Sequence, residues 1–168
     1  MSWFAIYTRP RWEKKILSTL SSLEIEVFLP LRKRLKQWSD RKKWVEEPLF
    51  PGYIFVNVTG RAYFDAINVT GAVRYVAFQG EAVVVPDAQI EAIRIFLLQL
   101  EAETKTEEPC PEPGVEVEII AGPLAGISGI MQGRKGHHKV TIYIESVKQS
   151  IMVEIPRNNI RISSSMQH

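Results

Sequence analysis

The spacing of hydrophobic and polar residues changes several times along the chain, and each change predicts an element. Residues 3–8 alternate as a β-strand does, and apolar residues then recur at helical spacing at Trp12, Ile16, Leu20 and Leu23. Residues 26–35, and the segment that follows Pro51-Gly52 up to residue 58, predict two further strands.

The pattern continues with short elements up to residue 101. Residues 61–69 have a helical period that ends at Gly71, and Gln79-Gly80 predicts a β-hairpin turn. Asp87 is the expected N-cap of a helix with a buried stripe of Ile90, Ile93, Leu97 and Leu100. The order of these elements predicts an α+β domain over residues 1–101, with helices packed on an antiparallel sheet.

The composition changes at residue 101. Residues 101–113 contain five Glu, one Lys and three Pro, a local charge of −4, and they lack any apolar period. We expect an extended acidic linker over residues 102–113. Residues 114–163 then alternate in four or five short segments, which predicts a small closed barrel, and residues 164–168 are expected to be a disordered tail.

The composition is that of a globular protein. The 168 residues are 45% hydrophobic and 24% charged, with a net charge of +2, so the chain is long enough for one medium domain or two small ones. Cys110 is the single cysteine, which excludes an internal disulfide or a cysteine zinc site. Neither a membrane span nor a signal peptide is evident, so we expect a cytoplasmic monomer without a membrane partner.

Candidate catalytic residues are few. The chain has three histidines and three aspartates. Their spacing does not suggest a catalytic arrangement of a nucleophile, a base and a group that orients the base. His137 and His138 lie in a basic turn without a nearby carboxylate or thiolate, which favours a solvated turn over a metal site. The prediction is therefore a binding protein that is not an enzyme and needs neither cofactor nor metal.

The strongest charge feature is the basic segment 32–44. Seven cations stand against Asp40, a local charge of +6: Arg32, Lys33, Arg34, Lys36, Arg41, Lys42 and Lys43. In a strand, Arg32, Arg34 and Lys36 share one face, as suits a cationic hairpin that binds nucleic-acid phosphates. Trp38 and Trp44 either stack on nucleotide bases or cover the end of the hairpin that joins the sheet. The alternative is a solvated sheet edge that its lysines protect from aggregation.

The stretch PLFPGYIFV, residues 48–56, also allows two interpretations. Residues 53–56 form a central strand covered on both faces, or one face of that strand is an apolar patch for a partner. Tyr53 and Phe55 lie on one face, and Ile54 and Val56 lie on the other. The pattern does not decide which face is covered.

Together these features resemble the NusG family of transcription elongation factors, in which an N-terminal NGN domain precedes a C-terminal KOW domain. The resemblance rests on FPGY at residues 50–53, on Gly71 before Val73, on Pro86-Asp87, and on the run Gly122-Pro123-Leu124-Ala125-Gly126 with Gly129 after it. WFAIYTRPRWEKK and WSDRKKWVEEPLFPGYIFV are more narrowly similar to UpxY-type antiterminators of capsular polysaccharide operons, which are related in role to RfaH.

The resemblance implies sites as well as a fold, with an SH3-like barrel as the KOW domain. The NGN domain of the family binds the clamp helices of the largest RNA polymerase subunit through an exposed patch, here Tyr7, Phe50, Tyr53 and Phe55. Contact with non-template DNA is implied for Arg9, Arg11, Lys14, Lys15 and Arg74. The cations of the basic hairpin are implied to contact upstream DNA or the polymerase.

The C-terminal region departs from the family pattern. Ile144-Glu145-Ser146 replaces the usual aromatic residue and glycine, which argues against contact with a ribosomal protein or Rho. Residues such as Val140 and Ile142 favour strand, so we expect a stable barrel without a helical alternative. Two alternatives to an operon-specific antiterminator are a general NusG and a KOW-type RNA-binding or ribosome-associated protein.

Overall fold

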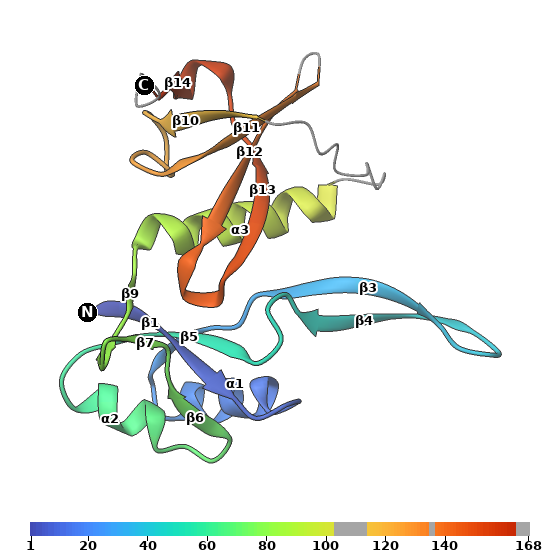
Figure 1. The fold of residues 1–168 in the computed structure, drawn as a ribbon. Helices are drawn as coiled ribbons and strands as arrows, with labels where there is room; N and C mark the ends of the chain where they lie inside the picture. Colours follow the sequence, from blue (N-terminus) through green and yellow to red (C-terminus); the bar gives the residue numbers. More distant parts are fainter. Residues whose placement is uncertain (103–113, 135–136, 164–168) are drawn as a thin grey trace. The chain divides into compact units, whose positions relative to one another are not determined.

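The computed structural model describes residues 1–102, 114–134 and 137–163, and the chain divides into two compact units, Met1–Pro86 and Asp87–His168 (Figure 1). Most of the predicted linker (103–113) and the predicted tail (164–168) lie outside the described residues. None of the helices in the described part of the chain has the length and hydropathy that a membrane span requires.

The first unit is built on a five-stranded antiparallel sheet. Its path is β2 (Glu26–Phe28), β5 (Tyr53–Val58), β1 (Ser2–Thr8) and β6 (Ala72–Tyr75), and β9 (Val84–Val85) also pairs with β1. The predicted first strand is confirmed, and the structure places it in the middle of the sheet. Its central position explains why Ala5 and Ile6 are both fully buried.

Two helices pack on one face of this sheet. α1 (Glu13–Ser22) and α2 (Arg61–Ile67) confirm the two helical patterns predicted before residue 70. Ile16 and Leu20 of α1 join Ile6 of β1 and Ile54 of β5 in one buried cluster. Because side chains alternate along a strand, Tyr7, Tyr53 and Phe55 lie on the opposite face.

A long two-stranded ribbon extends from this unit. β3 (Leu31–Gln37) pairs with β4 (Lys42–Pro48) through the whole length of both strands, and the ribbon projects beyond the sheet in Figure 1. The single strand predicted over residues 26–35 is wrong, because the chain breaks at Leu29-Pro30 between β2 and β3. Pro30 has no N–H to donate, but its carbonyl accepts a hydrogen bond of 2.8 Å from the N–H of Leu49 at the base of the ribbon.

The predicted turn at Gln79-Gly80 joins β7 (Ala77–Phe78) to β8 (Glu81–Ala82). Both turn residues have positive φ, 51° at Gln79 and 83° at Gly80. Positive φ at both central residues is the property of a type I′ turn, which matches the twist of a hairpin.

The second unit contains a helix and a five-stranded antiparallel sheet. The helix is α3 (Asp87–Ala102), and the strands are β10 (Val115–Ile119), β11 (Ser128–Arg134), β12 (His137–Ile144), β13 (Gln149–Glu154) and β14 (Ile160–Ile162). Two short 3-10 helices, Glu145–Val147 and Arg157–Asn159, connect the last strands. The sheet order is β13-β12-β11-β10-β14. No pairing of β13 with β14 is recorded in the described part of the chain, so closure into a barrel stays a prediction.

α3 packs against β13, although its sequence position suggests the first domain. The side-chain amide of Gln99 donates to the carbonyl of Glu154 at 3.1 Å, and its oxygen accepts from the N–H of Glu154 at 2.8 Å. β13 is an edge strand of its sheet, so its outer backbone groups have no neighbouring strand to pair with. Gln99 supplies hydrogen-bond partners for the N–H and the carbonyl of Glu154 at that edge.

Candidate functional site

Residues Phe50-Pro51-Gly52-Tyr53 form a tight turn immediately before β5. The N–H of Tyr53 donates to the carbonyl of Phe50 at 3.2 Å, and Gly52 has φ of +86°. Proline at the second position and a residue with positive φ at the third are the requirements of a type II turn. Local chemistry therefore determines how the chain enters β5 and where Tyr53 begins the strand.

Two hydrogen bonds hold Gly52 to neighbouring elements. Its carbonyl accepts from the N–H of Thr8 at the end of β1 at 2.9 Å, and its N–H donates to Oε1 of Glu13 at 2.9 Å. Glu13 begins α1 and is 5% exposed, so its carboxylate is committed to this contact. The turn is thus fixed to both the sheet and the first helix.

Beside the turn, three side chains form a row across adjacent strands. Tyr7 of β1 pairs with Tyr53 of β5 on one side and with Arg74 of β6 on the other. The two tyrosine rings lie 5.0 Å apart, and Cζ of Arg74 lies 4.9 Å from the centre of the Tyr7 ring. Burial, followed by the neighbouring Tyr7, raises the pKa of Tyr53 above its usual value. The row offers half-buried aromatic rings and an exposed cation to a partner.

The structure corrects the prediction that Tyr7, Phe50, Tyr53 and Phe55 together form an exposed patch. Phe50 is 2% exposed and Phe55 is fully buried, whereas the two tyrosines are half-buried. Phe55 contacts the rings of Phe28 and Phe50, at 6.1 and 6.4 Å between centroids. Phe50 and Phe55 therefore belong to the core, and they are not accessible to a partner.

The cations predicted around α1 are exposed, but two of them have partners within the chain. Nζ of Lys14 donates to the carbonyl of Glu46 at 2.9 Å, and Nζ of Lys15 lies 4.6 Å from the ring centre of Trp12. Arg9 and Arg11 are exposed on either side of Pro10. Among the five cations implied to contact non-template DNA, Arg74 packs on the Tyr7 ring and so belongs to the tyrosine row.

The ribbon has two chemically different faces. Cross-strand pairs place Arg32 opposite Glu47, Arg34 opposite Val45, and Lys36 opposite Lys43, so these six residues share a face, which we call the arginine face. The other face carries Lys33 opposite Glu46, Leu35 opposite Trp44, and Gln37 opposite Lys42. The predicted sharing of one face by Arg32, Arg34 and Lys36 is confirmed. Arg41 lies in the exposed turn at the tip.

One carboxylate lies among the cations of the arginine face. Oε1 of Glu47 is 2.5 Å from Nζ of Lys36, and Oε2 is 3.9 Å from Nη1 of Arg34. The pKa of Glu47 lies below its usual value, chiefly because of the hydrogen bond from Lys36. Burial opposes this effect, and the positive charges of Lys36, Arg34 and Arg32 lower the pKa further. Glu47 is ionised at neutral pH and partly neutralises this face.

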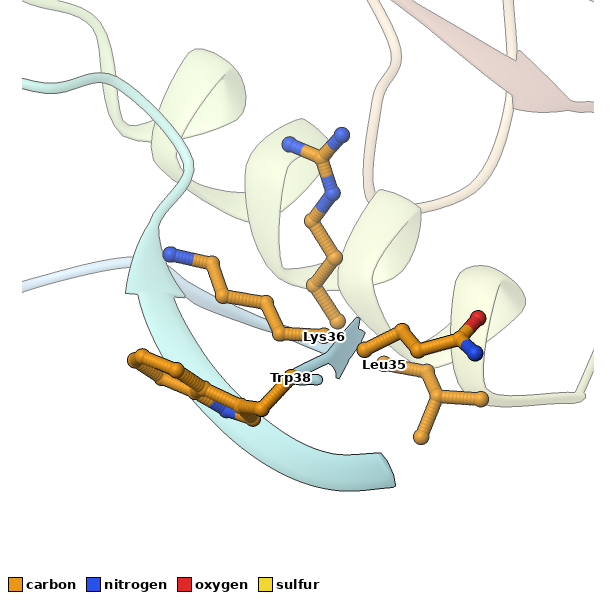
Figure 2. Close-up of a pocket in the computed structure, with 5 residues that line it drawn as sticks. Leu35, Lys36 and Trp38 are labelled. Atoms are coloured by element: carbon orange, nitrogen blue, oxygen red, sulfur yellow. The ribbon is translucent and has the colours of Figure 1, made fainter. Parts of the chain in front are cut away.

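A pocket of about 420 Å3 lies along β3 near the tip of the ribbon. It is lined by Arg34, Leu35, Lys36, Gln37 and Trp38. In Figure 2, Lys36 and Trp38 extend to one side of the strand and Leu35 to the other. Because Trp38 is 56% exposed, its ring is available to a ligand beside Lys36.

The family model for NusG, described as a transcription termination factor, matches residues 1–94 of the 168. The chain belongs to the NusG family. The match includes the turn, the tyrosine row and the ribbon, so all three are parts of a NusG-family transcription factor.

Two solved structures are similar to this chain. The structure described as "Domain interaction in Thermotoga maritima NusG" is 23% identical and covers 96% of both chains with a TM-score of 0.51, which supports the same mixed α/β fold. The second is described as "Crystal Structure of MjSpt4:Spt5 complex conformation B". Its sequence is 20% identical, the match covers 99% of both chains, and the TM-score is 0.29.

The NusG-family match ends before the C-terminal sheet, where the predicted KOW signature lies. Gly122 and Gly126 both have positive φ, 83° and 93°, and Leu124 between them is 2% exposed. The N–H of Gly126 donates to the carbonyl of Ile119 at 2.7 Å, which returns the loop to β10. Glu145 is exposed in a 3-10 helix, while its neighbour Ser146 is buried.

Two carboxylates of this NusG-family chain were not predicted as functional. Glu13 holds the turn and Glu47 holds two ribbon cations. Glu13 lies 39 residues before Gly52, so only the tertiary fold joins them. For Glu47, the alternation of side chains along β3 and β4 places it on the same face as Arg34 and Lys36, but only when the pairing register of the two strands is known. Within the described residues, no group of three or more His, Cys, Asp or Glu side chains is placed to hold a metal ion.

Proposed function

We propose that this chain is a non-enzymatic elongation and antitermination factor that binds RNA polymerase through its N-terminal unit. The observation that carries the proposal is the row of Tyr53, Tyr7 and Arg74 beside the type II turn. Half-buried aromatic rings with an exposed cation beside them supply contact area at low cost in side-chain entropy. The partner is the clamp-helix region of the largest polymerase subunit, as the family resemblance implies.

The finer assignment is to the operon-specific paralogues that oppose pausing or termination, rather than to a general NusG. Its support is the resemblance of residues 3–15 and 38–56 to UpxY-type antiterminators, together with Glu145 in place of the family's aromatic residue and glycine. The exposed ribbon and the cations near α1 supply contacts to nucleic acid near the polymerase. We place this activity in the cytoplasm.

Affinity capture of purified RNA polymerase by the full-length chain tests the proposal. We expect capture to persist at high salt, because aromatic contacts depend less on ionic strength than phosphate contacts do. Tyr53→Ala and Tyr7→Ala are expected to weaken capture about tenfold or more, as truncation of a central interface aromatic does. Phe55 is unsuitable for this test because its side chain is buried, and its substitution would disturb folding.

Phe64→Ala is the matched control, since Phe64 is an aromatic residue of α2 that is 63% exposed on the other side of the sheet. Loss of capture in the tyrosine variants but not in Phe64→Ala would support the docking surface. Equal capture by all variants would contradict that surface. Failure of the folded wild-type chain to bind polymerase would overturn the proposal and favour an RNA-binding or ribosome-associated protein.

A further inference from the structure

The arginine face of the ribbon is a row of cations with one acid in it. Alternate residues on one face of a strand are about 6.6 Å apart, so Arg32, Arg34 and Lys36 present charges at regular intervals along β3. Lys43 adds a fourth cation from β4, opposite Lys36. A regular row of cations on a projecting ribbon matches a polyanion with repeated charges.

Glu47 occupies the place that an anionic ligand would take on this face. Its two carboxylate oxygens contact different cations, Lys36 at 2.5 Å and Arg34 at 3.9 Å. Carboxylates and phosphates are both oxyanions that ammonium and guanidinium groups bind by charge-assisted hydrogen bonds. Arg34 and Lys36 are 61% and 48% exposed, so an incoming phosphate can reach them from solvent.

The same side of the ribbon presents an aromatic ring. Trp38 is 56% exposed and extends to the side of β3 on which Lys36 lies (Figure 2). Both residues line the open pocket along β3, so there is free space beside the Trp38 ring. Aromatic side chains beside a basic groove are typical of proteins that stack unpaired bases.

We propose that the arginine face binds single-stranded nucleic acid, with Lys36 and Arg34 exchanging Glu47 for a backbone phosphate while Trp38 stacks on the adjacent base. Glu47 then acts as an internal competitor that lowers the affinity of the ribbon for nucleic acid. This inference deepens the nucleic-acid contact that the proposed function includes, and it rests on that part of the function. A single strand is favoured over a duplex because stacking on Trp38 requires a base that is free of its partner.

Fluorescence anisotropy of a labelled single-stranded oligonucleotide, titrated with the full-length chain, tests the inference. Glu47→Gln keeps the side-chain size but releases two cations, so it should tighten binding about two- to fivefold, the range expected for a lost exposed ion pair. Lys36→Gln should weaken binding and reduce the slope of log affinity against log salt by about 1. Trp38→Ala should weaken binding about fivefold or more.

Two matched variants change the opposite face of the same ribbon. Glu46→Gln removes the same charge one position away, and Trp44→Ala removes a tryptophan that is 66% exposed. We expect Glu46→Gln to change affinity less than Glu47→Gln, and Trp44→Ala less than Trp38→Ala. Equal effects on both faces would overturn the assignment, because net charge and general aromatic exposure would then explain the binding.

Two further comparisons test the mechanism. In a Lys36→Gln background, Glu47→Gln should gain less affinity than in the wild type; an undiminished gain would show that Glu47 does not act through Lys36. A duplex of the same sequence should bind more weakly, and equal binding would contradict stacking by Trp38. Circular dichroism would confirm that each variant is folded. Because the assay contains no polymerase, a failure here is distinct from a failure of polymerase capture, which the ribbon variants should leave intact at high salt.

Discussion

The carboxylate of Glu13 accepts a hydrogen bond of 2.9 Å from the backbone N–H of Gly52, across 39 residues of sequence. This contact joins the first turn of α1 to the turn that begins β5. Tyr53 follows Gly52 directly, so the position of the tyrosine row depends on a side chain outside it. The contact therefore makes Glu13 a positioning residue for the proposed docking surface.

Glu13→Ala should lower the free energy of unfolding by about 1–3 kcal/mol, because the N–H of Gly52 loses its partner in a partly buried site. Glu13→Gln retains an acceptor oxygen and should cost less. Urea denaturation of both variants measures the difference. If Glu13→Ala were as stable as the wild type, the carboxylate would not be holding the turn.

Gly52→Ala should destabilise the protein by about 1–2 kcal/mol, since φ of +86° is unfavourable for a residue with a Cβ. Gly80→Ala is a close control, because Gly80 has φ of +83° and, like Gly52, has free space around an added Cβ. Both variants should lose similar thermal stability, but only Gly52→Ala should weaken polymerase capture. Equal weakening by both would indicate that capture follows stability rather than the geometry of the turn.

Tyr75→Phe should lower the free energy of unfolding by about 1–2 kcal/mol. The Tyr75 hydroxyl donates to the carbonyl of Tyr63 at 2.6 Å, and the two rings stack at 4.3 Å. Chemical denaturation measures the loss, and Tyr143→Phe, at an exposed tyrosine, should be nearly neutral. A neutral Tyr75→Phe would contradict a structural role for this hydrogen bond.

The same tyrosine predicts a loss of stability in alkali. Burial, with a smaller effect of Tyr63, raises the pKa of Tyr75 above its usual value. A raised pKa means that the unfolded chain loses this proton first, at pH near 10, so stability is retained below that pH and falls as pH rises above it. The fall, followed by denaturation at increasing pH, should be smaller in Tyr75→Phe. An equal fall in both proteins would assign it to other groups.

Gln99→Glu should loosen α3 from β13, because a carboxylate cannot donate to the carbonyl of Glu154. Repulsion between that carboxylate and the carbonyl oxygen should move the side chain away from the N–H of Glu154 as well, so amide hydrogen exchange at Glu154 should become faster. Leu98→Ala, at a neighbouring side chain that is 66% exposed, is the control and should leave that exchange unchanged. Unchanged exchange in Gln99→Glu would contradict the contact between α3 and β13.

Much of the local structure follows from the sequence because its causes are local. Proline and glycine at 51 and 52 predict the turn before β5, and the apolar period from Trp12 to Leu20 predicts α1. The alternation of Arg32, Arg34 and Lys36 likewise predicts a cationic face on a strand, which the structure confirms. The break at Leu29-Pro30 was missed because the apolar run around it also suits a continuous strand.

Burial and partner choice were decided by the tertiary structure. Alternation along β5 separates Tyr53 and Phe55 from Ile54 and Val56, but it does not say how deeply either face is covered, and Phe55 proved inaccessible. In the same way the sequence predicts a basic hairpin, but the register between β3 and β4 is what brings Glu47 to Lys36. The physical reason is range: turns and periods depend on neighbouring residues, whereas burial and ion pairs depend on segments that meet only when the chain has folded.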